Sequence, residues 1–436
     1  MILRLRKILP AFCALVLDGQ DCHALTGLRS LGRHNVQVTV ASDKPDAMSF
    51  YSRYCAQQIR SPSAARDPEL YGEWLLRTLG EQRYDALLFF GEASANVVMA
   101  HRDAVQALTG CPLPSPDAFL TADRKDRVMR LAHSIGVRAP HTHELASLDD
   151  VHALATSLRY PVVVKGVWGS CGHQVAVARD AAALRPTVER VAALRQTPDL
   201  PLPILQEYIP GVGYGVSALC RDGAPVAVFQ HRRLEEHDIM RGVTLAHGAA
   251  GAESVDEPEM RDAAAALLRA LHWDGMAMVE FRRSSLDGHF YLMEINPRFV
   301  GSLDLAVASG VDLPWLYTQQ AAGRPVIAPR SHRTGVRYHW LLSKNVAQAF
   351  ENPTGYLRAA LGTLRPGVHS DLCWSDPGPH YAHLRAAAWW IREHRRETHA
   401  PAAAAAPSDL VAAPVAPAAP ALAREATLEP EVPTRG

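Results

Sequence analysis

Hydrophobic and polar positions alternate regularly over the first 110 residues of the chain. Short apolar runs of the kind that form buried strands occupy residues 12–17, 36–41 and 85–90. Stretches with apolar residues three or four positions apart, as in an amphipathic helix, occupy residues 22–33, 68–80 and 93–108. Strands that alternate with helices in this way predict a parallel α/β domain.

The pattern changes after three closely spaced prolines between residues 112 and 116. β-rich runs then follow one another in pairs, with one helical pattern between them. The predicted strands are 161–166, 173–178, 202–208, 213–221, 224–230, 276–283 and 289–295, and the predicted helix is 256–271. The dipeptides Asp222-Gly223 and Asp287-Gly288 supply tight hairpin turns. We therefore predict an α+β fold with antiparallel sheets.

The C-terminal part of the chain divides into two regions of different composition. Residues 330 to 398 read as a small, mostly helical region that includes Trp389 and Trp390. The final 36 residues, from Pro401, hold 13 Ala and 7 Pro and too few large apolar groups to offset the entropy of ordering. The expected division is an α/β domain over 1–115, an α+β domain over 116–325, a helical region over 326–398 and a disordered tail over 399–436.

Charge and composition exclude several classes of protein. Lys plus Arg and Asp plus Glu both number 45, so no uniform positive field would gather nucleic acid. The sequence contains no run of 18 apolar residues, which is about the length that a membrane-spanning helix needs. The seven cysteines are odd in number and contain no CxxC pair, which argues against a disulfide framework or a zinc knuckle. A reducing cytoplasmic location fits best.

The start of the chain has two interpretations. Basic residues followed by an apolar run, MILRLRKILPAFCALVLDG, have the pattern of a signal peptide. No small-x-small cleavage site follows, and Asp18-Gly19 leads directly into the helical pattern of 22–33, so we interpret residues 12–17 as the first strand of a β-α-β unit. The turn after that strand reads DGQDCHAL instead of GxGxxG, which removes the main support for a dinucleotide-dependent oxidoreductase.

Lysine is scarce, since only 5 of the 45 basic residues are lysines. One of them, Lys165, ends an apolar strand run beside Gly166, Gly169 and Gly172. Glycines allow backbone N–H groups to approach phosphate oxygens closely, and a lysine adds a compact positive charge. The segment is a candidate phosphate site, and a flexible hairpin loop with a solvated lysine is the alternative.

A second segment, residues 204–216, runs from an apolar strand into Gln206, Glu207, Tyr208 and Ile209 and then into Pro-Gly. A strand end of this kind can present backbone C=O and N–H groups to the edge of a purine while Ile209 packs on its face. The alternative interpretation is an ordinary strand end followed by a turn, which would have the same sequence pattern.

The strongest chemical signal lies in the strand pair between residues 276 and 302. Glu280 stands among apolar residues, and Glu294 and Asn296 are two positions apart, so the latter two point to the same face of a strand. Acids within such apolar strands are unfavourable unless they are paired or bind a cation. Oxygen ligands on one sheet face suit Mg²⁺. Arg298 lies two positions after Asn296, so its side chain would point to the same face if Pro297 does not interrupt the strand alternation, and its guanidinium could bind a phosphoryl group there. An internal Glu–Arg ion-pair network is the alternative.

These segments together resemble the ATP-grasp superfamily. MEINPRFVGS, preceded by VEF, is similar to the metal-binding strand pair of its carboxylate-amine ligases and carbamoyl-phosphate-synthase-like members. DRKDRVMRLAHSIGVRAPHT looks like the first lysine segment, PVVVKGVWGSCG like the second lysine strand and QEYIPG like the adenine linker. The motifs stand in the family's order, and the resemblance covers about residues 1–325. It implies an ATP-grasp fold of two α+β subdomains behind an N-terminal α/β domain.

The resemblance implies a role for each matching residue. Lys125, Lys165 and the loop glycines Gly169 and Gly172 would contact ATP phosphates, and Gln206, Glu207, Tyr208 and Ile209 would hold adenine. Glu280, Glu294 and Asn296 would bind Mg²⁺, with Mn²⁺ as the alternative ion. Arg298 would steady the transferring phosphoryl group, which makes it the expected catalytic residue. The implied partners are a small-molecule carboxylate and a small-molecule amine, and the chain could form a homodimer.

Two segments depart from the family pattern. DRKDR stands where relatives have DK, a milder change that keeps Lys125. Relatives commonly carry RRLxEyPPtGG where this chain has RRLEEHDIMRGVTLAHG, so Arg233 and Glu236 match but the prolines and paired glycines do not. The altered segment, 236–248, lies where the acceptor is expected. Histidines 231, 237 and 247 occur here with irregular spacing, and we interpret them as packed or solvated. The segment indicates either an unusual substrate or impaired turnover.

Two functions follow from the sequence. The first is an ATP- and Mg²⁺-dependent ligase that joins a carboxylate to an amine through an acylphosphate, as the resemblance implies. The second is a non-catalytic ATP-binding module with a sensing or scaffolding role, for which the tail would be a tether. A complete metal and phosphoryl set favours the ligase, because binding alone seldom requires it.

Overall fold

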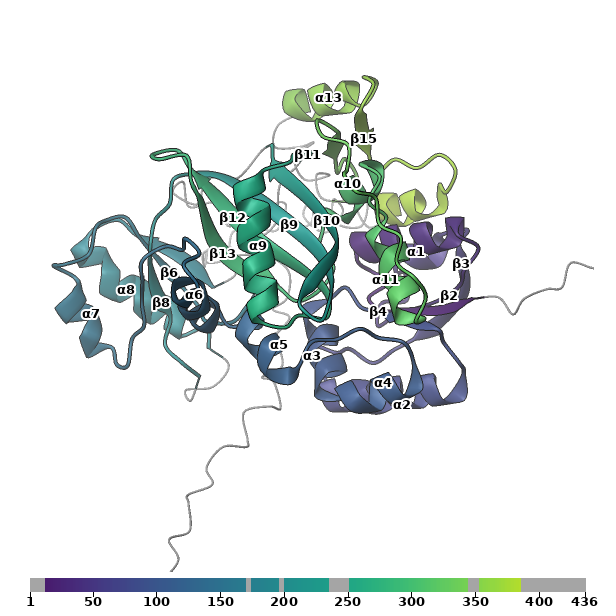
Figure 1. Cartoon of the computed structure of the whole chain (residues 1–436), viewed down its shortest axis with the longest axis horizontal. Coiled ribbons are helices and arrows are strands. Elements are labelled where there is room, and N and C mark those ends of the chain that lie inside the picture. The colour runs from purple at the N-terminus through teal and green to yellow at the C-terminus, as the bar shows by residue number, and fades with distance from the viewer. Residues whose placement is uncertain (1–11, 170–173, 196–199, 235–250, 344–352, 386–436) are drawn as a thin grey trace, which may run out of the picture.

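The computed structural model describes residues 12–169, 174–195, 200–234, 251–343 and 353–385. Three sheets organise this part of the chain, two with four strands and one with seven. Figure 1 shows the large sheet in the centre, one small sheet on its left and the N-terminal domain at lower right. Within the described residues, every helix is too short or too polar to cross a lipid bilayer.

The N-terminal sheet has the strand order β3-β2-β1-β4, and its printed pairings are parallel. Its strands are β1 (Cys13–Val16), β2 (Gln37–Ser42), β3 (Cys55–Arg60) and β4 (Ala86–Leu88). Its helices are α1 (Cys22–Arg33), η1 (Met48–Tyr51), α2 (Pro68–Glu81), α3 (Glu92–Ala100) and α4 (Arg102–Leu108). The predicted alternation of parallel strands and helices is confirmed, and residues 13–16 form a strand in the middle of the sheet. The single helix predicted over 93–108 is two helices, because the chain turns at His101.

Asp18 fixes the carboxyl end of this sheet, where its loops approach the large sheet. It has a left-handed backbone (φ 60°). Its carboxylate accepts hydrogen bonds from the backbone N–H of Phe90 (2.8 Å) and Gly91 (2.7 Å) and from the hydroxyl of Ser94 (2.6 Å). These bonds tie the end of β1 to the start of α3. They thereby position Glu92, the first residue of that helix.

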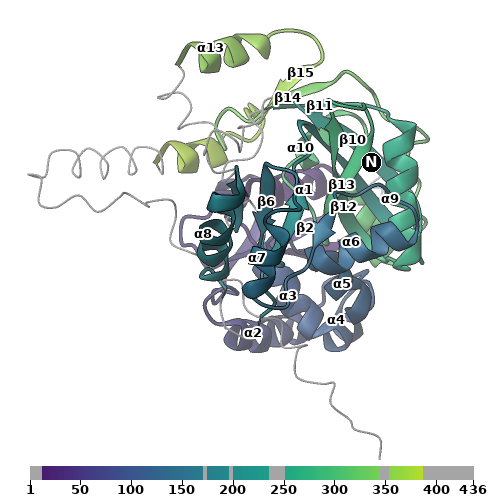
Figure 2. The same ribbon diagram turned by 90° about the vertical axis from the view of Figure 1, so that its left-hand side faces the viewer.

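The smaller antiparallel sheet has the order β5-β8-β6-β7. Its strands are β5 (Thr142–His143), β6 (Val162–Lys165), β7 (Val175–Ala178) and β8 (Ile204–Glu207). Helices α7 (Asp149–Leu154) and α8 (Ala181–Ala192) cover one face and share a core with Val162, Val164 and Leu205. Figure 2 shows α7 and α8 beside β6 on the side turned to the viewer. The alternate residues of β6 and β8 therefore face the other way, toward the rest of the molecule.

The large sheet has the order β13-β12-β9-β10-β11-β14-β15. Its strands are β9 (Gly211–Arg221), β10 (Ala224–Arg233), β11 (Gly251–Ser254), β12 (Gly275–Ser284), β13 (Phe290–Asn296), β14 (Arg337–His339) and β15 (Val368–Ser370). The remaining helices are α5 (Pro116–Asp123), α6 (Lys125–Ser134), α9 (Pro258–Ala270), α10 (Leu303–Ala308), α11 (Leu313–Ala321) and α13 (Pro353–Gly362). The predicted antiparallel pairs are confirmed, and the turn at Asp222-Gly223 has positive φ at both residues, as a tight hairpin requires.

The two faces of the large sheet pack against different elements. Alternate residues of β12, such as Ala277 and Val279, share a core with Leu267 of α9. Met276 instead packs in the core that contains α10 and α11. Because side chains alternate along a strand, Glu280 lies on the same side as Met276, away from α9.

The C-terminal residues differ in part from the expected helical region. They contain α13, but they also contribute β14 and β15 to the large sheet. Strands of three residues are too short to leave a periodic pattern, which is why the sequence did not indicate them. The tail predicted over 399–436 and the pair Trp389-Trp390 lie outside the described residues.

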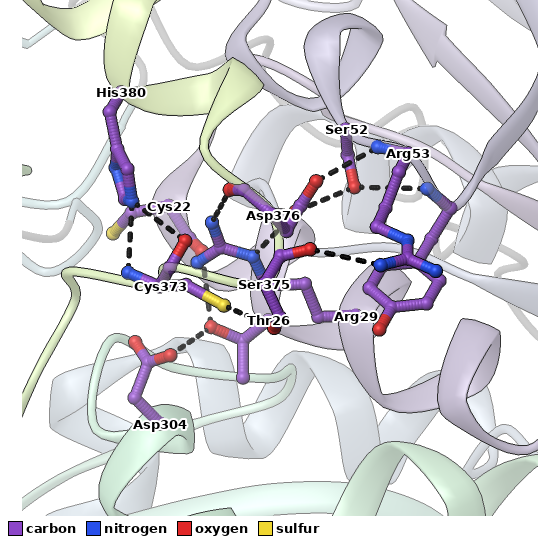
Figure 3. Close-up of polar contacts among 11 residues, drawn as sticks. Cys22, Thr26, Arg29, Ser52, Arg53, Asp304, Cys373, Ser375, Asp376 and His380 are labelled. Atoms are coloured by element: carbon purple, nitrogen blue, oxygen red, sulfur yellow. Dashed lines mark hydrogen bonds and ion pairs between the residues drawn. The ribbon is translucent and has the colours of Figure 1, made fainter.

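A buried carboxylate fixes the C-terminal segment to the N-terminal domain (Figure 3). Asp376 is fully buried. It accepts hydrogen bonds from Arg29 Nε, the Ser52 hydroxyl and the Arg53 backbone N–H, each at 2.8 Å. The arginine is buried as well, and its Nη2 also donates to the Asp376 carbonyl at 3.1 Å. Among the described residues, the Asp376 carboxylate is bonded to α1 and to the loop after η1, and it therefore anchors the C-terminal segment to the N-terminal domain.

We expect Asp376→Asn to lower the free energy of unfolding by about 2 kcal/mol, because a hydrogen bond between charged groups contributes about 1.5–3 kcal/mol. The change leaves Arg29 buried without its counter-charge. Urea unfolding measures the effect. Asp262→Asn, at an exposed ion pair with Arg261, is the control and should shift the midpoint very little. Equal midpoints for the two variants would contradict the anchor.

Candidate functional site

The predicted metal ligands lie opposite one another on two neighbouring strands. Glu280 of β12 pairs directly with Glu294 of β13. The register shifts immediately after Glu280, and this irregularity aligns the two carboxylates. Asn296 follows two positions after Glu294 and donates from Nδ2 to its Oε1 at 3.3 Å. The expected arrangement of these three residues on one sheet face is therefore present.

Lys165 approaches this face from the smaller sheet. It is the last residue of β6 and pairs with Ile204 of β8. Val163, two positions earlier, pairs with Gln206, so Lys165 and Gln206 share the sheet face that is turned away from α7 and α8.

Lys125 joins the two sheets. It is the first residue of α6 and only 8% exposed. Its ammonium lies 3.3 Å from Glu294 Oε2 and donates to the carbonyl of Gly169 at 2.6 Å. Its backbone N–H also donates to the carbonyl of Val167 at 3.0 Å. One residue thus contacts both the predicted metal site and the glycine-rich segment after β6, where Gly169 has φ 101°.

In the unusual DRKDR sequence, Arg124 makes two contacts at the start of α6. Its guanidinium lies 4.8 Å from the centre of the Trp168 ring and donates from Nε to Asp126 at 3.0 Å. A cation over an indole face is attracted by the ring electrons. Arg124 therefore holds the start of α6 against the segment that follows Lys165.

The charges of this cluster influence one another. Burial lowers the pKa of Lys165 to about 8, despite the attraction of Glu294. Burial acts to raise the pKa of Glu294, but Lys125 and Lys165 hold it below its usual value. The pKa of Lys125 is raised, because Glu294, Glu92 and Asp123 outweigh the opposite effect of burial. Glu294 is thus an anion between two cationic side chains.

Arg298 lines a small cavity beside these residues. It follows β13, and its Nη1 donates to the Phe299 carbonyl at 3.2 Å. The polar residues around the cavity come from the N-terminal domain, α5, α6 and β13. They are Glu92, Asn96, Asp123, Lys125, Glu294, Asn296 and Arg298.

Two acids in this cavity were missed by the sequence reasoning. Burial and the neighbouring Glu92 raise the pKa of Asp123 to about 7, against the attraction of Lys125 and Arg298. Asp123 stands two positions before Lys125 in the unusual DRKDR sequence, which was a usable signal. Glu92 had no such signal, since it belongs to another domain and reaches the cavity only through the docking of α3.

Arg233, which the sequence matched to the family pattern, contacts the predicted metal site. Its guanidinium donates to Glu280 from the end of β10. The altered segment 236–248, which includes His237 and His247, begins shortly after it and lies outside the described residues. His231 is buried beside Phe229 in a stacked arrangement, so its interpretation as a packed histidine is confirmed.

The predicted adenine residues lie at the other end of β6 from Lys165. Glu207 pairs with Val162, three positions before the lysine, which corresponds to about 10 Å along a strand. Tyr208 and Ile209 follow β8, and Ile209 is buried whereas Glu207 is exposed. These residues are therefore not in the phosphate cluster but beside it. Gly172 lies outside the described residues.

The donors present fit the groups that the resemblance implies. Two carboxylates and an amide oxygen on one sheet face suit Mg²⁺, and three nearby cationic side chains suit a polyphosphate. The buried amide oxygen of Gln206 has no hydrogen-bond partner among the described residues, while its amide nitrogen lies 3.0 Å from the Thr142 hydroxyl. An unpaired buried acceptor at this position suits an amino group of a bound base.

Comparisons with known proteins agree with this geometry. The family model described as "RimK-like ATP-grasp domain" matches residues 122–265, and that described as "ATP-grasp in the biosynthetic pathway with Ter operon" matches residues 199–343. The N-terminal section of carbamoyl phosphate synthase large chain from Methanopyrus kandleri is 23% identical over 228 residues, which is 51% of this chain and 40% of that protein. The chain thus spans less than half of this relative.

Solved structures show the same fold. The biotin carboxylase domain of Hydrogenobacter thermophilus 2-oxoglutarate carboxylase, in complex with MgADP, ADP and bicarbonate, has a TM-score of 0.60 at 15% identity, covering 74% of this chain and 73% of that one. N5-carboxyaminoimidazole synthetase from Staphylococcus aureus has a TM-score of 0.58 at 15% identity, covering 79% and 86%. At these identities the likeness establishes the fold.

Proposed function

Because this chain belongs to the ATP-grasp superfamily, we propose that it is an ATP- and Mg²⁺-dependent ligase that joins a small-molecule carboxylate to an amine through an acylphosphate. One observation carries the proposal: two sheets and helix α6 bring together six side chains around one site, namely Glu280, Glu294, Asn296, Lys125, Lys165 and Arg298. A protein that only senses ATP has no need of such a complete metal and phosphoryl set.

Each residue of the set has a separate task in this proposal. Lys125 and Lys165 hold the phosphates of ATP, and Gly169 permits close approach of the backbone. Glu280, Glu294 and Asn296 hold Mg²⁺, for which Mn²⁺ is a chemically similar substitute. The bound ion would neutralise charge on the phosphates. Lys125 is already 3.3 Å from Glu294, so it also keeps that carboxylate oriented before the ion binds.

Arg298 has the position to hold the acceptor. It lines the cavity beside Asn296, and a guanidinium fork matches a carboxylate or a phosphoryl group. In the proposed reaction the carboxylate attacks the γ-phosphorus and ADP leaves, and the amine then attacks the acyl carbon and phosphate leaves. Catalysis in this step comes from positioning and charge neutralisation, since phosphoryl transfer asks little covalent chemistry of a protein. We also propose that the protein acts in the cytoplasm.

A screen of ADP release tests the proposal. The full chain is incubated with ATP and either Mg²⁺ or Mn²⁺, and with pooled carboxylates in the presence and absence of pooled amines. We expect at least one carboxylate pool to raise ADP release well above the rate without substrate. If ATP binds tightly and every pool stays at background, the ligase function is wrong and the chain is a nucleotide-binding module.

A further inference from the structure

The segment that follows β6 lies beyond the hydrogen bonding of its strand pair. β6 pairs with β7 along its whole length, and Gly166 adds one further backbone hydrogen bond, to the Gln174 carbonyl at 2.8 Å. Residues 167–169 come after this pairing, so their position depends on other contacts. Their position matters for the proposed site, because the Gly169 carbonyl accepts a hydrogen bond from the Lys125 ammonium.

The start of α6 contacts all three residues of this segment. The Lys125 backbone N–H donates to the Val167 carbonyl at 3.0 Å, and the Lys125 ammonium donates to the Gly169 carbonyl at 2.6 Å. Between these two bonds, the Arg124 guanidinium lies over the Trp168 ring, 4.8 Å from its centre. Three consecutive residues of the segment thus contact two consecutive residues at the start of the helix.

Arg124 is itself held in place. It is the single residue between α5 and α6, and its backbone is extended (φ −98°, ψ 116°). Its Nε and Nη2 donate to the two carboxylate oxygens of Asp126 at 3.0 and 2.5 Å. Asp126 is buried and also accepts a hydrogen bond from Arg130 at 3.0 Å. Because the guanidinium is planar and bound at two atoms, Trp168 meets a cation of fixed orientation.

The direction of the Lys125 ammonium depends on this arrangement. A lysine side chain samples many rotamers, and fixing it costs conformational entropy. Among the described residues, the ammonium contacts Glu294 at 3.3 Å and the Gly169 carbonyl. The second contact requires that the segment stay against α6. The attraction between the Arg124 guanidinium and the Trp168 ring acts at this point.

We propose that Arg124 and Trp168 form a clamp that positions Lys125 for the phosphates of ATP before the nucleotide binds. In this role neither side chain needs to touch the nucleotide. A lysine that is already oriented binds phosphate without the entropy loss of ordering it. The inference rests on the proposed phosphate-binding role of Lys125 and adds two positioning residues to it. It also gives a role to the arginine by which DRKDR departs from DK.

The clamp is tested first without ATP, by the reactivity of lysine amines. The full chain is treated with trace acetic anhydride, and the acetylation of each lysine is followed by mass spectrometry. Trp168→Leu should raise the acetylation rate of Lys125 about tenfold, because loss of the contact increases the population in which this buried amine is accessible. Trp168→Phe keeps an aromatic face and should restore the wild-type rate. Lys44, which is 50% exposed, is the internal standard. Equal Lys125 rates in all three proteins would overturn the clamp.

The effect on nucleotide binding is measured by calorimetry with ATP and Mg²⁺. Trp168→Leu and Arg124→Met should each raise the Kd for ATP about tenfold, and the double variant should show no further rise, because both changes remove the same contact. Trp168→Phe should bind ATP as the wild type does. Arg324→Met is the matched control, since Arg324 makes the same kind of contact, 4.7 Å from the centre of the Phe12 ring near the start of β1.

Additive effects of Arg124→Met and Trp168→Leu, or a Trp168→Phe variant that binds ATP as weakly as Trp168→Leu, would contradict the clamp. Trp168→Leu leaves the ion pair of Arg124 with Asp126 intact, so the test holds even if Arg124→Met is unstable. The ligase function is judged separately, by ADP release from the wild type. Its absence would contradict the ligase and not the positioning of Lys125, which the acetylation rates measure.

Discussion

Glu294→Gln is expected to abolish Mg²⁺-dependent ADP release, with a fall in kcat of about 10³-fold, or ~4 kcal/mol. The glutamine keeps the size of the side chain but removes the charge that lies between Lys125 and Lys165. Without that charge the proposed metal site loses one of its two carboxylates. The two lysines would then also repel each other without a counter-charge.

The measurement is ADP release across an Mg²⁺ titration, together with the Mg²⁺ dependence of ATP affinity. Glu259→Gln is the control, since Glu259 lies on α9 in an exposed ion pair with Arg138. Both proteins should show the circular dichroism of the wild type. If Glu294→Gln retained the Mg²⁺ response of the wild type, Glu294 would not be a metal ligand.

Lys165→Met is expected to raise the Kd for ATP about 100-fold at pH 7, because it removes a buried positive charge from the proposed phosphate site. The methionine preserves the length of the stem, so the strand pairing of β6 with β8 should survive. Isothermal titration calorimetry with ATP and Mg²⁺ measures the effect. Lys44→Met, at a lysine that is 50% exposed in the N-terminal domain, should bind ATP as the wild type does.

The same lysine predicts a pH dependence. Burial lowers the pKa of Lys165 to about 8 in the free protein. Below that pH the lysine is charged and ATP binds fully; above it, binding must first restore the proton. Wild-type affinity should therefore fall about tenfold between pH 8 and pH 9.5, whereas Lys165→Met should show no such fall. A parallel fall in both proteins would assign the titration to another group.

Local patterns predicted much of the fold. The strands expected at 276–283 and 289–295 are present as β12 (Gly275–Ser284) and β13 (Phe290–Asn296), because one face of each is buried and the alternation is regular. The edge strand β3 was not predicted. Four of its six residues are exposed, so its sequence lacks the alternation of apolar and polar residues that identifies a half-buried strand.

The sequence predicted the individual motifs of the candidate site, but it did not predict which of their side chains come into contact. Two-residue spacing placed Glu294 and Asn296 on one face, and the sequence of Lys165 and its glycines indicated a phosphate site. No spacing indicated that Lys125 would lie 3.3 Å from Glu294 or that Glu92 would share a cavity with Arg298. These contacts come from domains and sheets that pack together, and such packing leaves no periodic trace in the chain.

The sequence by itself determined which elements form, which faces of β12 and β13 are polar, and which side chains can serve ATP and Mg²⁺, because side-chain alternation and turn chemistry are local properties. Only the tertiary structure decided which of those side chains meet. It placed Lys125 between Glu294 and Gly169, anchored Asp376 on Arg29, and brought Glu92 of the N-terminal domain to the cavity that Arg298 lines. Those outcomes depend on how distant surfaces fit and on the free energy of burying charge only where it is paired.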